Sequence, residues 1–153
     1  MSEYRATVEW QLAGEFKYET YSRAYSIDFG SGVRLAGTAA AANIPKTVPA
    51  TPGADPEQQF VASLSSCHML WFLHLACSRK YVVESYRDEA SGVLAKNAQG
   101  KDAMTQVTLR PVVRFAGSAP SAEDHRKLHE KAHQRCFIAN SVNSEVVIEP
   151  RVA

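Results

Sequence analysis

The sequence predicts an α+β fold in which antiparallel sheets pack on a long buried central helix. Three observations lead to this class. The first third alternates polar and apolar residues with the period of strands, and a helix that is apolar nearly all round begins near residue 56. The elements also run in the order βββ-α-ββ-α-β, without the regular alternation of an α/β protein. With 153 residues the chain can bury the core of one domain, so we predict a single domain over 1–153.

The first third predicts a meander of short antiparallel strands. Polar and apolar residues alternate over Tyr4–Trp10 and again over Tyr21–Phe29, with glycine turns after each stretch. A third short strand is expected at Val33–Ala36. The segment 38–55 contains three prolines and predicts a long loop, a kind of segment that often carries function.

The central helix has a clear start. Asp55 can cap it, Pro56 suits its first position, and Gln58 completes a capping box, so we predict a helix to about Ser78. Apolar residues occupy most of its faces, which is typical of a buried helix. One predicted face has residues at steps of four, three, four and three: Phe60, Leu64, Cys67, Trp71 and His74.

The second half predicts two strands, a helix and a last strand. The strands are expected at Tyr81–Val93 and Met104–Phe115, and Pro111 favours an edge strand or a bulge. A second helix is expected from Ser121 to about Ile138. The last short strand is expected at Glu145–Glu149.

Composition excludes several classes of function. Seventeen basic and sixteen acidic residues give a net charge of +1, so neither a nucleic acid nor an anionic membrane is an expected partner. The most apolar stretch, Met69–Cys77, is nine residues long, and the first ten residues lack the layout of a signal peptide. We therefore expect a cytoplasmic protein. No phosphate-binding loop or dinucleotide fingerprint is present, and we expect no cofactor.

Three cysteines are the main candidates for chemistry. Cys67 lies midway along the central helix, too far from its start for the helix dipole to activate the thiol, so a reactive Cys67 needs a nearby cation. Cys136 or Cys77 could supply the second thiol of a dithiol cycle. Cys67 and Cys77 are about 15 Å apart along one helix, so a disulfide between them would require the helix to unfold.

A metal site is a competing interpretation. The histidines at 125, 129 and 133 step by four, and a face of His129, His133 and Cys136 could bind a transition metal. His68 and His74 could add ligands. Charged residues interleave with these histidines, however, and indicate a solvated helix face. No paired Cys-x-x-Cys or His-Glu-x-x-His motif is present, so we expect no metal.

Two segments together resemble a known family. In the segment from Pro56 to Leu73, Glu57 precedes Cys67 by ten residues and small residues come just before the cysteine. In the segment from Ala132 to Val142, Cys136 is followed by Asn-Ser. Both segments are similar to the cysteine motifs of the OsmC/Ohr family (osmotically inducible protein C and organic hydroperoxide resistance). The residues around Cys67 resemble the less characterised OsmC-like branch more than the Ohr branch.

The resemblance implies an OsmC-like fold, built as an intertwined homodimer with two active sites at the interface. It also implies a thiol peroxidase for organic hydroperoxides, including those of fatty acids, that is reset by a dithiol of the lipoyl type. Cys67 would be the peroxidatic cysteine and Cys136 the resolving one. Glu57 would hold an arginine beside the thiolate, for which Arg23 is the first candidate and Arg34 the second.

A protein of a different class would use the same residues. A non-enzymatic dimer could bind a lipophilic ligand between its long helices, on the apolar face that contains Phe60, Leu64 and Trp71. The two alternatives differ in their sulfur chemistry, because a binding protein loses nothing when its thiols are replaced.

Overall fold

The computed structural model describes residues 1–153 and has the predicted α+β class. The chain forms two compact units, Met1–Gln59 and Phe60–Ala153, which are described here one at a time. The single domain over 1–153 stays a prediction.

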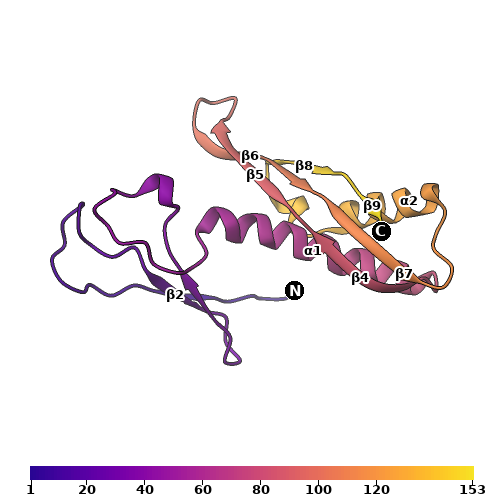
Figure 1. Cartoon of the computed structure of the whole chain (residues 1–153), viewed down its shortest axis with the longest axis horizontal. Helices are drawn as coiled ribbons and strands as arrows, with labels where there is room; N and C mark the ends of the chain where they lie inside the picture. The colour runs from indigo at the N-terminus through magenta and orange to yellow at the C-terminus, as the bar shows by residue number, and fades with distance from the viewer. The chain divides into compact units, whose positions relative to one another are not determined.

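The first unit contains the predicted antiparallel meander. Its strands are β1 (Thr7–Glu9), β2 (Tyr25–Asp28) and β3 (Arg34–Gly37), and they pair in the order β1-β2-β3 (Figure 1). They are shorter than the alternation suggested, because the chain from Trp10 to Ser22 forms an irregular loop closed by a hydrogen bond of 2.8 Å from Trp10 Nε1 to the Ser22 carbonyl. The long proline-containing loop follows, with one turn of 3₁₀ helix, η1 (Ala41–Asn43).

Helix α1 (Pro56–Ser78) begins with the predicted capping box. The Gln58 amide donates to Asp55 Oδ1 at 2.7 Å, and the Asp55 amide donates to Gln58 Oε1 at 3.1 Å. By length and composition alone α1 could also cross a membrane, a test that the core helix of a soluble protein passes equally.

The deepest face of α1 shares only one residue with the face identified by spacing. Its buried residues are Leu64, His68, Phe72 and Ala76. Cys67, Trp71 and His74 lie on the neighbouring face and keep contact with solvent. A helix that is apolar nearly all round has no contrast between faces, so its sequence did not indicate which side packs deepest.

The two strands predicted after α1 are in fact four. A bend divides each stretch, and the strands are β4 (Val82–Asp88), β5 (Ser91–Lys96), β6 (Asp102–Leu109) and β7 (Pro111–Ala116). The carboxylate of Asp88 connects both bends to α1 through hydrogen bonds. Asp88 accepts the Arg110 amide at 2.6 Å and the Ser65 hydroxyl of α1 at 2.5 Å. These bonds stabilise the sharp change of direction between neighbouring strands.

Two short strands complete the sheets, which are mixed rather than purely antiparallel. Strand β8 (Glu145–Ile148) pairs parallel with β6, and β9 (Arg151–Val152) pairs parallel with β7. The prediction of an edge strand at Pro111 was wrong, because β7 is central in the order β4-β7-β9. Proline is tolerated there as the first residue of its strand.

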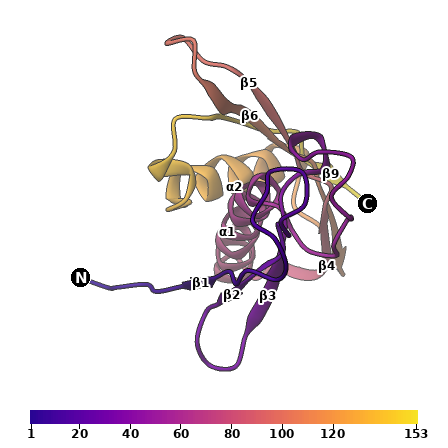
Figure 2. The same ribbon diagram turned by 90° about the vertical axis from the view of Figure 1, so that its left-hand side faces the viewer.

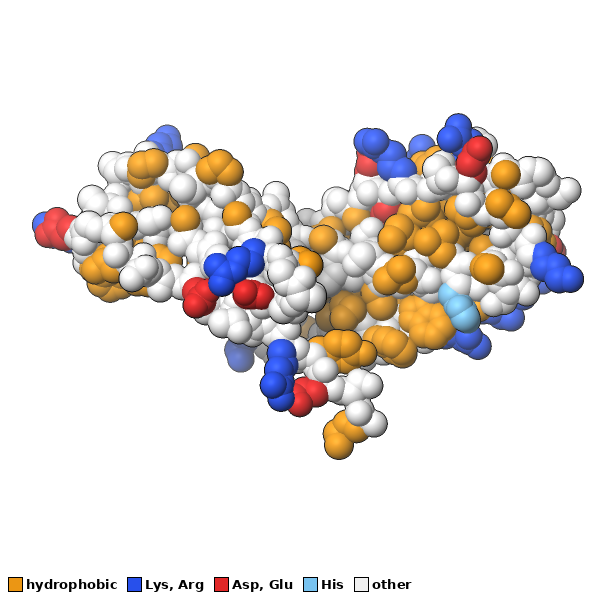
Figure 3. Space-filling view, turned by 90° about the horizontal axis from the view of Figure 1, so that it is seen from below, with side chains coloured by type: hydrophobic (Ala, Val, Ile, Leu, Met, Phe, Trp, Pro, Cys, Tyr) orange, Lys and Arg blue, Asp and Glu red, His pale blue; other side chains and the backbone are white.

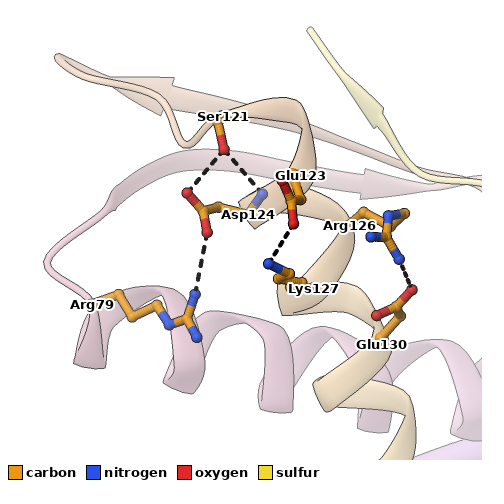
Figure 4. A network of polar contacts seen from close by, with 7 residues as sticks. All are labelled: Arg79, Ser121, Glu123, Asp124, Arg126, Lys127 and Glu130. Carbon is orange, nitrogen blue, oxygen red and sulfur yellow. Dashed lines mark hydrogen bonds and ion pairs between the residues drawn. The ribbon is translucent and has the colours of Figure 1, made fainter.

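Helix α2 (Ala122–Arg135) lies alongside α1 (Figures 1 and 2). Figure 4 shows its start, where the Ser121 hydroxyl accepts the Asp124 amide at 3.1 Å and Asp124 pairs at 3.8 Å with Arg79, the residue that follows α1. The helix ends at Arg135, before the predicted Ile138, because Cys136 has an extended backbone. The core between α1, α2 and the strands is formed by Phe72, Ala76, Val113, Leu128 and Ala132.

A core truncation checks this packing. Leu64 is fully buried among residues of β6, including Val107 and Leu109. Leu64→Ala is expected to lower the free energy of unfolding by about 3–5 kcal/mol, because it removes buried methyl groups and leaves a cavity. Urea denaturation measures this, with Leu94→Ala on β5 as the control, since Leu94 is 52% exposed. An equal loss in both variants would contradict the described core.

Candidate functional site

The structure brings two of the three cysteines together. Cys67 lies in the middle of α1, and Cys136 is the residue that ends α2. The Cys67 thiol lies close enough to Cys136 to influence the ionisation of the Cys136 thiol. Cys136 is 1% exposed, and burial together with this proximity raises the pKa of its thiol to about 11. Cys77 is exposed near the end of α1.

An apolar cavity of about 530 Å³ opens over Cys67. Two serines of α1 contribute to its lining, and the larger lining side chains are Leu70, Trp71, His74, Phe137 and Ile138. Figure 3 shows apolar side chains gathered on this face of the second unit. The lining contains no arginine or lysine. A lipophilic molecule therefore fits the cavity, but the cavity itself supplies no strong cation to Cys67.

Aromatic side chains form one wall of this cavity. Trp71 contacts Phe137 edge to face, with ring centroids 5.5 Å apart, and the guanidinium of Arg135 lies 5.6 Å from the Trp71 ring centroid. Sequence reasoning missed both Arg135 and Phe137. The signal was available, because they are the two neighbours of Cys136 in the chain.

Arg23 is held in the first unit. It is 9% exposed and donates to the carbonyls of Tyr21 at 2.6 Å and Tyr18 at 2.8 Å, while its guanidinium lies 3.4 Å from the Tyr21 ring centroid. It lines an apolar cavity of about 520 Å³ whose aromatic walls include Trp10, Phe16, Tyr21 and Tyr25. A buried guanidinium that is bonded to backbone carbonyls remains a full positive charge.

Glu57 lines the same cavity as Arg23. Its Oε2 atom is buried without a hydrogen-bond partner, and no ion pair joins it to Arg23 in this structure. Arg34, the second candidate, is exposed instead and pairs with Asp28 at 3.1 Å and Glu9 at 3.5 Å. The buried Glu57 oxygen without a partner indicates a place for a hydrogen-bond donor. Of the two candidate arginines, Arg23 is buried as this oxygen is, whereas Arg34 is exposed.

The histidines of α2 are not the solvated face that the sequence suggested. His125 and His129 are 4% and 2% exposed, and His129 stacks on Phe72 with ring centroids 4.2 Å apart. His68 of α1 bonds to His129. Neutral imidazoles pair with one another in the core, while the charged residues between them point outward. The predicted face of His129, His133 and Cys136 does not converge, and no group of three or more such side chains is placed to hold a metal.

Fold and site together define an α+β protein with two cysteines close together beneath an apolar cavity. Residues 49–151 match the family model described as OsmC-like protein, and the chain belongs to this family. The resemblance read from the two cysteine motifs is thereby confirmed.

Solved structures agree with this assignment. An OsmC-like protein of unknown function from Vibrio cholerae is 44% identical, covering 98% of this chain and 99% of its own, with a TM-score of 0.93. Organic hydroperoxide resistance proteins share the fold at lower identity. The one from Elizabethkingia anophelis is 17% identical, covering 100% of this chain and 96% of its own, with a TM-score of 0.67. OhrB of Bacillus subtilis is 19% identical, covering 98% of each chain, with a TM-score of 0.58. No curated protein matches the sequence.

Proposed function

We propose that the protein is a thiol-dependent peroxidase that reduces organic hydroperoxides to alcohols. The observation that carries the proposal is the proximity of the Cys67 and Cys136 thiols beneath an apolar cavity. Membership of the OsmC-like family supports it, because organic hydroperoxide resistance proteins share this fold.

The chemistry follows from the two thiols. The Cys67 thiolate attacks one oxygen of the hydroperoxide, the O–O bond breaks, and the alkoxide takes a proton and leaves as alcohol. Cys67 is then a sulfenic acid. Cys136 attacks the sulfur of Cys67, the S–O bond breaks, and water leaves as the disulfide forms. A dithiol of the lipoyl type then resets the pair by thiol–disulfide exchange.

A cation must stabilise the Cys67 thiolate and the departing oxygen. Because the cavity lining has no arginine or lysine, we propose that this cation is Arg23, held by Glu57, in a site completed at the interface of a homodimer. The burial of Arg23 beside an unpartnered Glu57 oxygen supports this choice over the exposed Arg34.

Replacing the two arginines separates the candidates. Arg23→Gln is expected to slow the oxidation of Cys67 by about 10- to 100-fold, because it removes the positive charge that stabilises the thiolate and the departing oxygen. Arg34→Gln is expected to leave this rate unchanged. Stopped-flow measurement of the first oxidation step checks both, and the reverse result would assign the role to Arg34.

The proposed function is tested by the mass of the reduced protein before and after one equivalent of cumene hydroperoxide. We expect the loss of two hydrogens, and peptide mapping should place a disulfide between Cys67 and Cys136. Cysteines that remain reduced would overturn the proposal.

A second candidate function is the binding of a lipophilic ligand by a non-enzymatic dimer. The two apolar cavities, of about 530 and 520 Å³, favour it. If the double variant Cys67→Ser/Cys136→Ser protects cells or binds ligand as well as the wild type, this second function is the correct one.

A further inference from the structure

Arg135 is a cation without an acidic partner beside the cavity over Cys67. With the exception of Arg151 near the C-terminus, every other arginine pairs with a carboxylate or donates to a carbonyl. The side chain of Arg135 is exposed, and its guanidinium lies 5.6 Å from the ring centroid of Trp71, a residue that lines the cavity. The N–H groups of Arg135 are therefore free to bind an anion at the edge of this cavity.

The chain segments that form the cavity contain no acidic residue. All of its lining residues belong to segments 58–83 and 131–144, which have neither Asp nor Glu although the chain has sixteen such residues. Lys131, one helical turn before Arg135, is a further cation of the second segment. From the strands, Asp88 reaches α1, but hydrogen bonds occupy both of its oxygens. The charge around the cavity is therefore positive and favours an anionic ligand.

The cavity itself fits an apolar body. Its larger lining side chains are apolar or aromatic, and Cys67 is part of the lining. Trp71 comes one helical turn after Cys67 on α1, about 6 Å further along the helix axis. A ligand whose apolar part fills the cavity can therefore place one end at Cys67 and an anionic group at Arg135. The planar fork of a guanidinium matches the two oxygens of a carboxylate.

We propose that Arg135 binds an anionic group of the substrate, so that the protein reduces hydroperoxides that carry a carboxylate faster than neutral ones. The inference rests on the proposed peroxidase function. Arg135 acts here in specificity and not in breaking the O–O bond, because it is absent from the lining around the Cys67 thiol. This role is separate from that of Arg23, which is proposed to stabilise the thiolate.

The test compares two hydroperoxides that differ in one charge, the hydroperoxide of linoleic acid and that of its methyl ester. Stopped flow measures the second-order rate constant for the oxidation of Cys67 by each. In the wild type we expect the acid to react about 10-fold faster than the ester, since a charge-assisted hydrogen bond adds to its binding. Arg135→Gln should slow the reaction of the acid to that of the ester and leave the ester unchanged. Because the site is exposed, added salt should reduce the wild-type preference.

Arg126→Gln is the matched control. Arg126 is an exposed arginine of the same helix, but it pairs with Glu130 (Figure 4). This variant should keep the wild-type preference for the acid. Arg135→Lys retains the charge without the planar fork, so it should keep part of the preference.

A ligand that cannot react gives a second measurement. In Cys67→Ser no oxidation of residue 67 takes place, and calorimetric titration can compare dodecanoate with dodecanol. We expect dodecanoate to bind more tightly, and the added change Arg135→Gln should remove the difference. Equal binding of the two compounds to Cys67→Ser would contradict the anion site.

The outcomes separate this inference from the proposed function. If Arg135→Gln keeps the preference for the acid, or slows the acid and the ester equally, Arg135 does not determine specificity. Loss of the preference in Arg126→Gln would assign it to the overall charge of α2, and this also overturns the role of Arg135. In each of these cases the peroxidase stands. If neither hydroperoxide oxidises Cys67 in the wild type, the peroxidase and the inference fail together.

Discussion

Cys67→Ser is expected to reduce the consumption of organic hydroperoxide to the uncatalysed rate, because it removes the sulfur that accepts the peroxide oxygen. Cys136→Ser is expected to complete a single turnover. Without the second thiol, Cys67 should remain as sulfenic acid and then pass to sulfinic acid in excess peroxide. Peroxide consumption in the presence of a dithiol and the intact mass of each variant measure the two outcomes.

Cys77→Ser provides the control for both variants. Cys77 is exposed and lies on the same helix as Cys67, about 15 Å further along it. Its replacement should leave turnover and the oxidised mass shift unchanged. Sustained turnover in Cys67→Ser would show that this cysteine is not the peroxidatic residue.

Acid is expected to destabilise the protein strongly. The loss of stability should begin at a pH well above the range in which most carboxylates take up protons. The pKa of His68 is about 4 and that of His129 about 2 in the folded protein, against 6.5 for an ordinary histidine. Between pH 6.5 and about 4 the unfolded chain therefore binds protons that the folded chain does not, so stability falls as the pH falls. From pH 7 to pH 5 each of these two histidines should contribute a loss of about 2 kcal/mol, or about 4 kcal/mol together.

Urea denaturation at pH 7, 6 and 5 measures this loss. In His129→Leu the difference in the free energy of unfolding between pH 7 and pH 5 should shrink by about 2 kcal/mol, since one titrating group is gone. The comparison uses the pH dependence, so a general loss of stability in the variant does not affect it. The same pH dependence in both proteins would show that other groups cause the acid sensitivity.

Local features of the sequence predicted the fold well where neighbouring residues determine the structure. The start of α1 depends on Asp55 and Gln58, which bond to each other's backbone, and it lies where the capping box placed it. The three strands of the first unit were predicted in their correct order and pairing. The family followed from two motifs that surround Cys67 and Cys136.

Features that depend on distant partners could not be predicted in this way. The parallel pairing of β8 with β6 joins segments almost forty residues apart, and nothing in four residues of strand indicates it. The burial of His125 and His129 was missed for a chemical reason. In a sequence pattern a histidine counts as polar beside charged neighbours such as Arg126, but a neutral imidazole can enter a core when another imidazole accepts the hydrogen bond from its N–H group.

The position of Cys136 at the end of α2 has a consequence for the stability of the oxidised protein. A bond from Cys67 to Cys136 would close a covalent ring that contains β4 to β7 and the whole of α2. Restricting a ring of about 70 residues in the unfolded chain corresponds to about 4 kcal/mol. The oxidised form should therefore melt at a higher temperature and resist proteases longer than the reduced form. Resistance to cleavage would then report how much peroxide the protein has met.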